Sequence, residues 1–155
     1  MLRFYFIIFI SIPLIIYYIS VADYYCRHTE KYSEKDRYRL ALEIIENIKK
    51  RGRIETVSID TDKLPKDTGY IMYSNHQGKY DALGIMSAHD SPCSVVIDSK
   101  KSRLPVLDQV IELVNGKRLD RNDYHQQYRE LQNLVNEVKN GRKYIYFPEG
   151  GYKHN

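Results

Sequence analysis

The chain has 155 residues and a formal net charge of +4, so it is long enough for one domain once its apolar first stretch is set aside. Acidic and basic residues are interleaved, as in "YSEKDRYRLALEIIENIKKRG" (32–52), which excludes the purely basic stripe typical of nucleic-acid binding. A mild positive charge suits an anionic membrane surface or a phosphorylated ligand. Cys26 and Cys93 lie far apart and outside any metal-ligand spacing, which favours two free thiols over a disulfide.

The first predicted element is an apolar helix at the amino terminus. No charged residue occurs from Phe4 to Val21, and a helix of this length reaches about 27 Å, close to the ~30 Å hydrocarbon core of a membrane. Tyrosines flank both ends, where interfacial aromatics are common. More basic residues follow this stretch than precede it, so the positive-inside rule places residues 23–155 in the cytoplasm. We therefore expect residues 1–22 to be a single-pass anchor in the cell membrane.

A cleaved signal peptide is the alternative for the same residues. Ser20-Val21-Ala22 resembles a small-x-small cleavage site. Against it, only Arg3 precedes the apolar run, and the run is longer than the usual apolar region of a signal peptide.

Beyond the first helix, predicted helices alternate with short apolar segments. Helical periodicity and end signals predict helices over 33–50, 82–88, 104–113 (with Pro105 near its first position) and 123–139. Gly52 and Gly141 are expected just beyond two of them. Strands are expected over 53–59, 70–74, 94–98, 114–119 and 143–147, with a turn over 64–69. This alternation predicts an α/β fold whose largely parallel sheet is flanked by helices on both faces.

Chemically active side chains follow three of the predicted strands. His76 comes after 70–74, Asp120 and Arg121 come after 114–119, and Glu149 comes after 143–147. Ligands of open parallel sheets bind beyond the carboxyl ends of the strands. We therefore expect these side chains to converge on one site, which favours an enzyme.

His76 and Asp81 are the candidate catalytic pair. A continuous helix would leave side chains five positions apart separated by about 140° around its axis, so the pair requires a turn, and Gly78 tolerates one. A His at a strand end, oriented by an Asp at the start of the next helix, is a general base for a substrate hydroxyl. A surface His near a helix-capping Asp is the alternative interpretation.

Two further segments carry candidate ligand groups. "NGKRLDRND" (115–123) offers arginines that can bind a phosphate with two parallel hydrogen bonds, although a solvated charged loop has the same composition. "YFPEGG" (146–151) places Glu149 between Pro148, which fixes the backbone, and glycines that allow a ligand close. An ordinary strand-to-loop turn is the alternative there.

Three motifs, taken together and in order, resemble the glycerolphosphate acyltransferase family, which includes the 1-acylglycerol-3-phosphate acyltransferases. They are "NHQGKYD" (75–81), which fits the HxxxxD motif, "LDRND" (119–123) and "FPEG" (147–150). The resemblance implies an acyltransferase of phospholipid biosynthesis that moves an acyl group from acyl-CoA or acyl carrier protein to the hydroxyl of a lysophospholipid at a phospholipid membrane. It implies no cofactor beyond this co-substrate.

The resemblance also assigns roles to individual residues. His76 would be the base and Asp81 its partner, while Arg121, next to Asp120, would bind the acceptor phosphate. Glu149 and Gly150 would form part of the acceptor site.

The sequence departs from the family pattern in three places. Asn115 stands where the family usually has glycine, with Gly116 one position later, and Gly151-Tyr152 replaces the usual continuation after the third motif. These two departures bear on the identity of the acceptor. The family domain also normally continues well past this motif, so we expect residues 23–155 to be the amino-terminal part of an acyltransferase domain, as a fragment or a natural truncation.

Two other functions compete with an active acyltransferase. One is an inactive remnant that serves as a membrane-associated lipid- or partner-binding module. The other is a metal-dependent hydrolase with His76 and Asp81 as ligands, but no third ligand stands at a suitable spacing, so no metal is expected. The remaining histidines are expected at the surface: His28, His89, His125 and His154.

Overall fold

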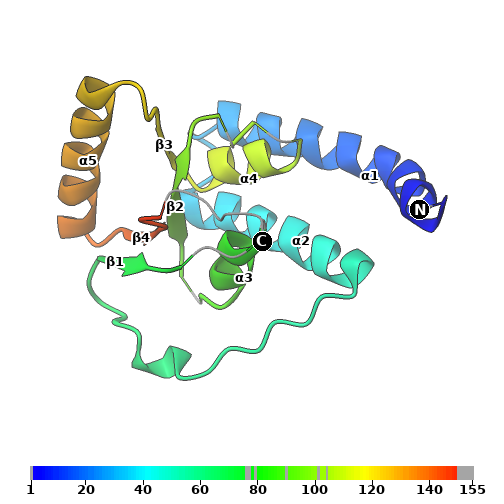
Figure 1. The fold of residues 1–155 in the computed structure, drawn as a ribbon, viewed down its shortest axis with the longest axis horizontal. Coiled ribbons are helices and arrows are strands. Elements are labelled where there is room, and N and C mark those ends of the chain that lie inside the picture. The colour runs from blue at the N-terminus through cyan, green and yellow to red at the C-terminus, as the bar shows by residue number, and fades with distance from the viewer. Residues whose placement is uncertain are drawn as a thin grey trace.

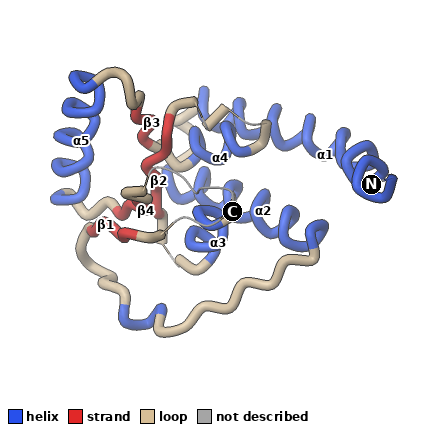
Figure 2. The backbone as a smooth tube through the Cα atoms, viewed as in Figure 1, coloured by secondary structure: helices blue, strands red, loops and turns tan. Residues whose placement is uncertain are grey.

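The computed structural model describes residues 2–75, 78, 80–89, 91–100, 102–103 and 105–149, with side chains from residue 12 onward. Helices and strands alternate along most of this length (Figures 1 and 2). The elements are α1 (Leu2–Arg27), α2 (Glu34–Gly52), the short 3-10 helix η1 (Thr61–Lys63), β1 (Tyr70–Tyr73), α3 (Asp81–Ser87), β2 (Cys93–Asp98), α4 (Leu107–Leu113), β3 (Lys117–Leu119), α5 (Tyr124–Lys139) and β4 (Lys143–Tyr146).

The strands form a four-stranded sheet in the order β1-β4-β2-β3, and every neighbouring pair within it is parallel. All strands therefore end at the same side of the sheet, which we call the carboxyl edge. It comprises the last residues of the strands and the segments that follow them. The opposite side, with the first residues of the strands and the segments that precede them, is the amino edge. The predicted parallel sheet is confirmed.

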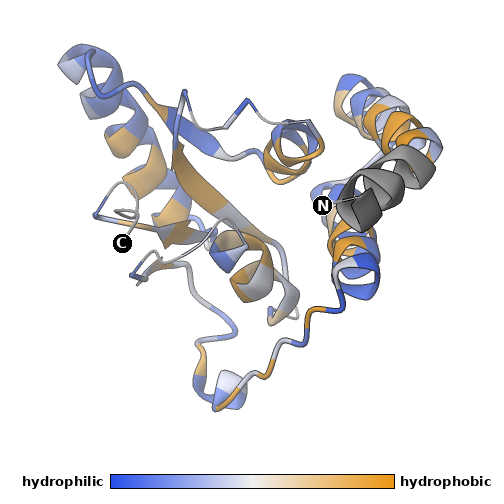
Figure 3. Ribbon diagram, turned by 45° about the vertical axis from the view of Figure 1, so that its right-hand side comes forward, coloured by the Kyte–Doolittle hydropathy of each residue, from blue (hydrophilic) through white to orange (hydrophobic). Residues whose placement is uncertain are grey.

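Helices cover both faces of the sheet, with α5 on one face and α1 to α4 on the other (Figure 1). Side chains alternate between the faces along a strand. Val95 and Ile145 accordingly join the larger core with α1 to α4, whereas Val96 and Tyr144 join a smaller core with Leu134 of α5. Figure 3 shows the middle of the sheet as hydrophobic. This two-sided burial explains why the central strands are continuous apolar runs.

Helix α2 begins where its sequence predicts. Ser33 is the N-cap, and its Oγ accepts a hydrogen bond from the Asp36 amide at 3.2 Å. The Ser33 amide donates to the Asp36 carboxylate at 3.1 Å, which completes a capping box. At the other end Gly52 is the last helical residue, and Arg53 adopts the left-handed conformation with a φ of 52°. The expectation that Gly52 would follow the helix was therefore wrong by one position.

The strand expected over residues 53–59 does not form. The segment has no regular structure, and the Val57 and Ile59 side chains are 81% and 80% exposed. Its alternation of apolar and polar residues resembles a strand. However, a strand needs a sheet partner and a core beneath one face, and this connection between α2 and β1 has neither among the described residues.

Helix α4 also starts later than its sequence suggests. Pro105 was expected near the first helical position, but the helix begins at Leu107. Val106 precedes it with a positive φ of 70°, and its amide donates to the Gln109 side chain at 2.9 Å. This left-handed residue breaks the path from Pro105 into the helix, and Pro105 therefore belongs to the preceding loop.

Helix α1 packs on α2 and α4. The Tyr18 hydroxyl donates to Glu43 at 3.0 Å and accepts from Asn47 at 2.7 Å, and Ala22 is fully buried. Among the residues whose side chains are described, no helix is both long and apolar enough to cross a membrane. The expected span from Phe4 to Val21 lies partly outside those residues, since the side chains of its first part are not described.

Candidate functional site

The carboxyl edge collects the segments in which the candidate site residues lie. β1 leads toward His76, β2 ends in Asp98, β3 leads into Asp120 and Arg121, and β4 leads into Glu149. In the order β1-β4-β2-β3, β1 and β3 form the two outer strands. Two of the expected site residues, His76 and Gly150, lie outside the described residues. The pairing of His76 with Asp81 therefore remains a prediction.

The turn expected before Asp81 is present. The Gly78 amide donates to Asp81 Oδ2 at 2.8 Å, and the Asp81 amide donates to the Gly78 carbonyl at 3.3 Å. Asp81 is the first residue of α3. Its carboxylate is thereby fixed at the start of the helix and turned back toward the segment that follows β1. This is the arrangement that the spacing of the first motif requires.

Arg121 is an exposed cation of the carboxyl edge. Its Nε lies 2.6 Å from Asp98 Oδ2, and its side chain is 55% exposed, whereas that of Asp98 is 13% exposed. Asp98 Oδ1 accepts a hydrogen bond from the Lys100 amide at 2.9 Å, which fixes the carboxylate at the end of β2. No other partner of Arg121 occurs in the described part of the chain. Its terminal nitrogens are therefore available to an anion.

The two other basic residues of the 115–123 segment are engaged inside the molecule. Arg118 donates to Asp108 at 2.8 Å and to the Ser102 hydroxyl at 3.1 Å, and it also pairs with Glu112. Lys117 lies 2.6 Å from Glu137. The interpretation as a solvated charged loop is thus wrong for these two residues, whose ion pairs join β3 to α4 and α5.

Asp120 and Asp123 shape the loop that carries Arg121. Asp120 Oδ1 accepts from the Asn122 amide at 2.9 Å, and its carbonyl accepts from the Gln127 side chain at 2.7 Å. Asp123 is the N-cap of α5. These bonds hold the loop in a fixed turn. A substrate-binding role for Asp120 remains a prediction.

Glu149 lies at the surface just beyond β4, after an exposed Pro148. Its position on the carboxyl edge agrees with its place in the third motif. Contact between Glu149 and a substrate remains a prediction.

Sequence reasoning missed Asp98 as a member of this site. Its position in the sequence could have identified it. Asp98 is the last residue of a predicted strand, and His76, Arg121 and Glu149 also come just after predicted strands. Its pairing with Arg121 depends on β2 and β3 being neighbours in the sheet, and a single sequence does not give the strand order.

The other histidines fall into three groups. His125 is exposed on α5, as expected, and His28 at the end of α1 is partly exposed with its Nδ1 at 2.8 Å from the Tyr24 carbonyl. His89 was expected at the surface and is instead buried, with 5% exposure, because it packs behind α3 next to the first strand. His154 lies outside the described residues.

The cysteines and carboxylates offer no second reactive centre in the described part of the chain. Burial raises the pKa of the Cys93 thiol to about 12 and that of Cys26 to about 11, and the thiolate rather than the thiol is the nucleophile. Both cysteines are free, as predicted. Among the described residues, no group of three or more His, Cys, Asp or Glu side chains is placed to hold a metal ion.

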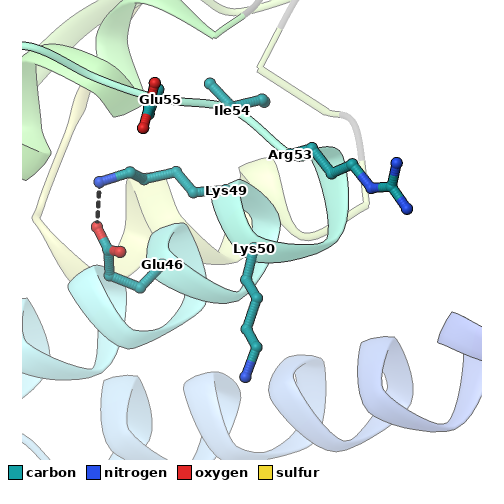
Figure 4. Close-up of a pocket in the computed structure, with 6 residues that line it drawn as sticks. All are labelled: Glu46, Lys49, Lys50, Arg53, Ile54 and Glu55. Atoms are coloured by element: carbon teal, nitrogen blue, oxygen red, sulfur yellow. Dashed lines mark hydrogen bonds and ion pairs between the residues drawn. The ribbon is translucent and has the colours of Figure 1, made fainter.

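A separate cavity of about 410 Å³ lies at the end of α2 and is shown in Figure 4. Lys49 forms an ion pair with Glu46 at 2.6 Å, whereas Lys50 and Arg53 point away from that pair. The cavity is not part of the carboxyl edge. Its lining consists of charged helix-end side chains together with Ile54 and contains no arrangement of nucleophile and base.

Comparison with known proteins identifies the family. The family model described as Acyltransferase matches residues 56–155, which contain all three motifs. No curated protein gives a significant match.

The fold is similar to the crystal structure of PlsC from Thermotoga maritima, a 1-acyl-sn-glycerophosphate (LPA) acyltransferase. The two share 25% sequence identity with a TM-score of 0.67, over 98% of this chain and 60% of that chain. The present chain thus spans about three fifths of that relative's length. The family model covers well over half of the present chain and includes the residues of the carboxyl edge. The chain therefore belongs to the Acyltransferase family.

Proposed function

We propose that this protein transfers a fatty acyl group from acyl-CoA or acyl carrier protein to the hydroxyl of a lysophospholipid such as 1-acylglycerol-3-phosphate. The observation that carries the proposal is the carboxyl edge itself. There an exposed arginine, fixed by Asp98 through its Nε, shares one side of a parallel sheet with the turn that presents Asp81. Family membership supplies the reaction class, and similarity to PlsC, an LPA acyltransferase, supports the acceptor class.

The chemistry follows from an acid–base pair without a protein nucleophile. His76 removes the proton of the acceptor hydroxyl while its oxygen attacks the thioester carbonyl, and Asp81 stabilises the imidazolium that forms. The new C–O bond forms as the C–S bond breaks. The proton on His76 then passes to the departing thiolate. The products are the diacylated lipid and the free thiol, so the step is balanced without a redox partner or a metal.

Arg121 is proposed to hold the acceptor through its phosphate. A guanidinium presents its donors as a planar fork that matches a phosphate in two parallel hydrogen bonds. Nε is bound to Asp98 and the side chain is 55% exposed, which leaves the terminal nitrogens for the phosphate. The acceptor would then be fixed at one end by its phosphate and at the other by the base that activates its hydroxyl. Asp120, Glu149 and Gly150 would complete the acceptor site.

We also propose that the protein works at a phospholipid membrane, with its catalytic part on the cytoplasmic side. The support is helix α1, which exposes apolar side chains where its surface is described: Ile12 is 41% exposed, Ile16 58% and Tyr17 56%. Apolar side chains gathered on one helix are a feature of membrane interaction sites. The acceptor and product of the proposed reaction are themselves membrane lipids.

The test is a direct assay of the chain in mixed detergent–lipid micelles. Labelled acyl-CoA, or acyl carrier protein loaded with the same chain, is supplied together with 1-acylglycerol-3-phosphate, and the diacylated product is separated and counted. We expect product that depends on both substrates and is lost in the His76→Ala protein. Product formation by that variant at the wild-type rate would contradict the assigned base.

The inactive membrane-associated module is the second candidate function, and the same preparation distinguishes it. Its support is the exposed apolar surface of α1. Vesicle sedimentation measures membrane binding independently of catalysis. Binding to vesicles with no acyl transfer from either donor would favour the module and overturn the enzyme.

A further inference from the structure

The amino edge of the sheet contains a second concave surface with unusual chemistry. A cavity of about 270 Å³ lies between the η1 loop and the first residues of β1 and β4. Its polar lining comes from Thr61, Lys66, Tyr70, His89, Ser91 and Lys143. No carboxylate occurs among the described residues that line it. The cavity therefore carries basic groups without an acid of its own.

Lys143 is the central cation of this cavity. The residue is only 7% exposed, and its ammonium donates to the Ser91 hydroxyl and, at 3.4 Å, to the Lys66 carbonyl. An ammonium has three N–H donors, so one remains. Within the described ranges Lys143 forms no ion pair, and its Nζ lies 5.8 Å from the centre of the Tyr70 ring. A buried charge without a counter-charge is costly, which favours an anion at this position.

His89 adds a second unsatisfied group to the same lining. Its Nδ1 lies 2.8 Å from the Ile85 carbonyl, which can only accept, so Nδ1 carries the proton. In the neutral ring Nε2 is then an acceptor. Nε2 is buried and has no partner among the described residues. The His89 ring lies 6.2 Å from the Tyr70 ring, whose other neighbour is the Lys143 ammonium.

The two groups together specify a ligand with two functions. It must accept a hydrogen bond from an ammonium, and it must donate one to an imidazole nitrogen. Hydrogen phosphate does both, because it carries negative oxygens and retains one O–H at mildly alkaline pH. Sulfate has the same shape and charge but has no O–H, and it would leave Nε2 buried and unpaired, a defect that lowers affinity.

We propose that this amino-edge cavity is a binding site for a small oxyanion that bears a hydroxyl, of the hydrogen-phosphate type. The anion accepts from Lys143 and donates to His89 Nε2. Because the cavity is bounded by the η1 loop and by the first residues of the paired strands β1 and β4, the bound anion would contact both strands and the loop before them. The site lies at the opposite edge of the sheet from Arg121. It is thus separate from the acceptor phosphate of the proposed reaction.

The experiment is calorimetric titration of the chain with inorganic phosphate and with sulfate, at mildly alkaline pH and matched ionic strength, without acyl donor. A parallel titration of the Arg121→Gln protein removes binding at the carboxyl edge. We expect phosphate to bind at least about tenfold more tightly than sulfate, the cost of one unmet buried hydrogen bond. We expect this preference to persist in Arg121→Gln. A failed acyl-transfer assay would leave this binding result untouched.

Variants locate the site. Lys143→Met should weaken phosphate and sulfate alike, whereas Lys63→Met, which removes an exposed lysine of η1, should weaken neither. His89→Gln should reduce the preference for phosphate over sulfate, since an amide can donate to either anion. Circular dichroism checks that each variant is folded. Because Lys143 is buried, Ser91→Ala serves as the second test if Lys143→Met unfolds, and it should weaken phosphate binding.

Three results would overturn the proposal. The first is no phosphate binding by the folded chain. The second is that the wild type binds phosphate and sulfate with equal affinity and that His89→Gln binds them with the same affinities as the wild type. The third is phosphate and sulfate binding that the folded Lys143→Met protein leaves unchanged, since Lys143 would then not hold the anion. A competition with vesicles that contain phosphatidic acid shows where the bound anion comes from. If the vesicles displace phosphate from the site, the ligand is a lipid headgroup. If they do not, the ligand is a soluble anion.

Discussion

Arg121 at the carboxyl edge and Lys143 at the amino edge are held in opposite ways. At the carboxyl edge Arg121 is exposed and paired with a fixed carboxylate, Asp98, whereas at the amino edge Lys143 is buried and donates only to neutral oxygens among the described residues. The exposed arginine is thus positioned but accessible, as binding and release of a substrate require. Among the described residues the buried lysine has no counter-charge, as expected of a site that retains a small anion.

The amino edge also contains the densest ion-pair network that the structure describes. Glu137 of α5 pairs with Lys117 at 2.6 Å and with Arg142 at 2.8 Å, and it accepts from the Tyr144 hydroxyl. Arg142 continues to Glu34 of α2 at 2.7 Å. These contacts join helices on opposite faces of the sheet. We infer that the amino edge stabilises the fold, whereas the carboxyl edge carries the groups that bind and convert the substrate. The predictions below test this division.

The largest expected effect is at the base. His76→Ala should lower the acyl-transfer rate by about 10²–10⁴-fold, which is the usual contribution of a general base. His125→Ala, at an exposed position on α5, is the matched control and should keep the wild-type rate. Initial rates with saturating donor measure both. An equal loss of acyl-transfer rate in the two variants would contradict the role of His76 as the general base.

Asp81→Asn is expected to cost less, about 10²-fold in rate. An asparagine oxygen can still accept from the Gly78 amide, so the turn should be retained. What is lost is the negative charge that stabilises the imidazolium. Circular dichroism together with initial rates separates these two effects. A folded variant with an unchanged rate would contradict the pairing of Asp81 with His76.

Arg121→Lys should raise KM for a phosphorylated acceptor by about tenfold with a smaller change in kcat, because a lysine cannot form the two parallel hydrogen bonds of the fork. Arg129→Lys, at an exposed position on α5, is the control and should leave KM unchanged. Steady-state kinetics over a range of acceptor concentrations provides the values. An unchanged KM in Arg121→Lys would mean that Arg121 only forms a structural ion pair with Asp98 and does not bind the acceptor.

The amino-edge network should make stability sensitive to acid. Burial raises the pKa of Glu137, but its hydrogen bonds with Lys117, Tyr144 and Arg142 outweigh this and lower the pKa below the ordinary 4.5. Because the pKa of this carboxyl group is lower in the folded protein than in the unfolded chain, the group stabilises the fold at pH values above its unfolded-state pKa. This stabilisation is lost as the pH falls through the folded-state pKa. The free energy of unfolding, measured with urea across the acid range, should show this loss. It should fall less with acid in Glu137→Gln than in the control Glu130→Gln, which removes a carboxylate 3.8 Å from Lys117. Identical profiles for the two variants would contradict the assignment.

The smallest expected effect is at Asp98. Asp98→Asn keeps an oxygen for the Arg121 Nε–H but removes the charge, so Arg121 should be held less firmly. We expect a severalfold rise in KM for the phosphorylated acceptor, smaller than that of Arg121→Lys, with kcat little changed. A fall in KM would instead mean that Asp98 competes with the substrate for Arg121.

The sequence predicted those parts of the fold that local pattern controls. The helix start at Ser33, the period of α5 and the apolar runs of β2 and β4 are local signals, and each element lies within a few residues of its expected place. The failures came where tertiary contacts decide. Residues 53–59 alternate like a strand but have no described partner, and the left-handed Val106 delays the start of α4.

The candidate site divides in the same way. The loops after β1, β3 and β4 were predicted to meet because parallel strands end at one edge, and the turn expected before Asp81 is present. The Asp98–Arg121 pair and the buried His89 and Lys143 were not predicted. These depend on which strands are neighbours and on which side chains the helices cover, and neither is encoded in a local pattern.

Acceptor discrimination tests the central claim most directly. The kcat/KM of the wild-type protein is measured with 1-acylglycerol-3-phosphate and with the monoacylglycerol that lacks the phosphate, and the ratio is compared with that of Arg121→Gln. We predict that the wild type prefers the phosphorylated acceptor and that Arg121→Gln loses most of this preference. A preference that survives intact in Arg121→Gln, or transfer to neither acceptor, would contradict the account.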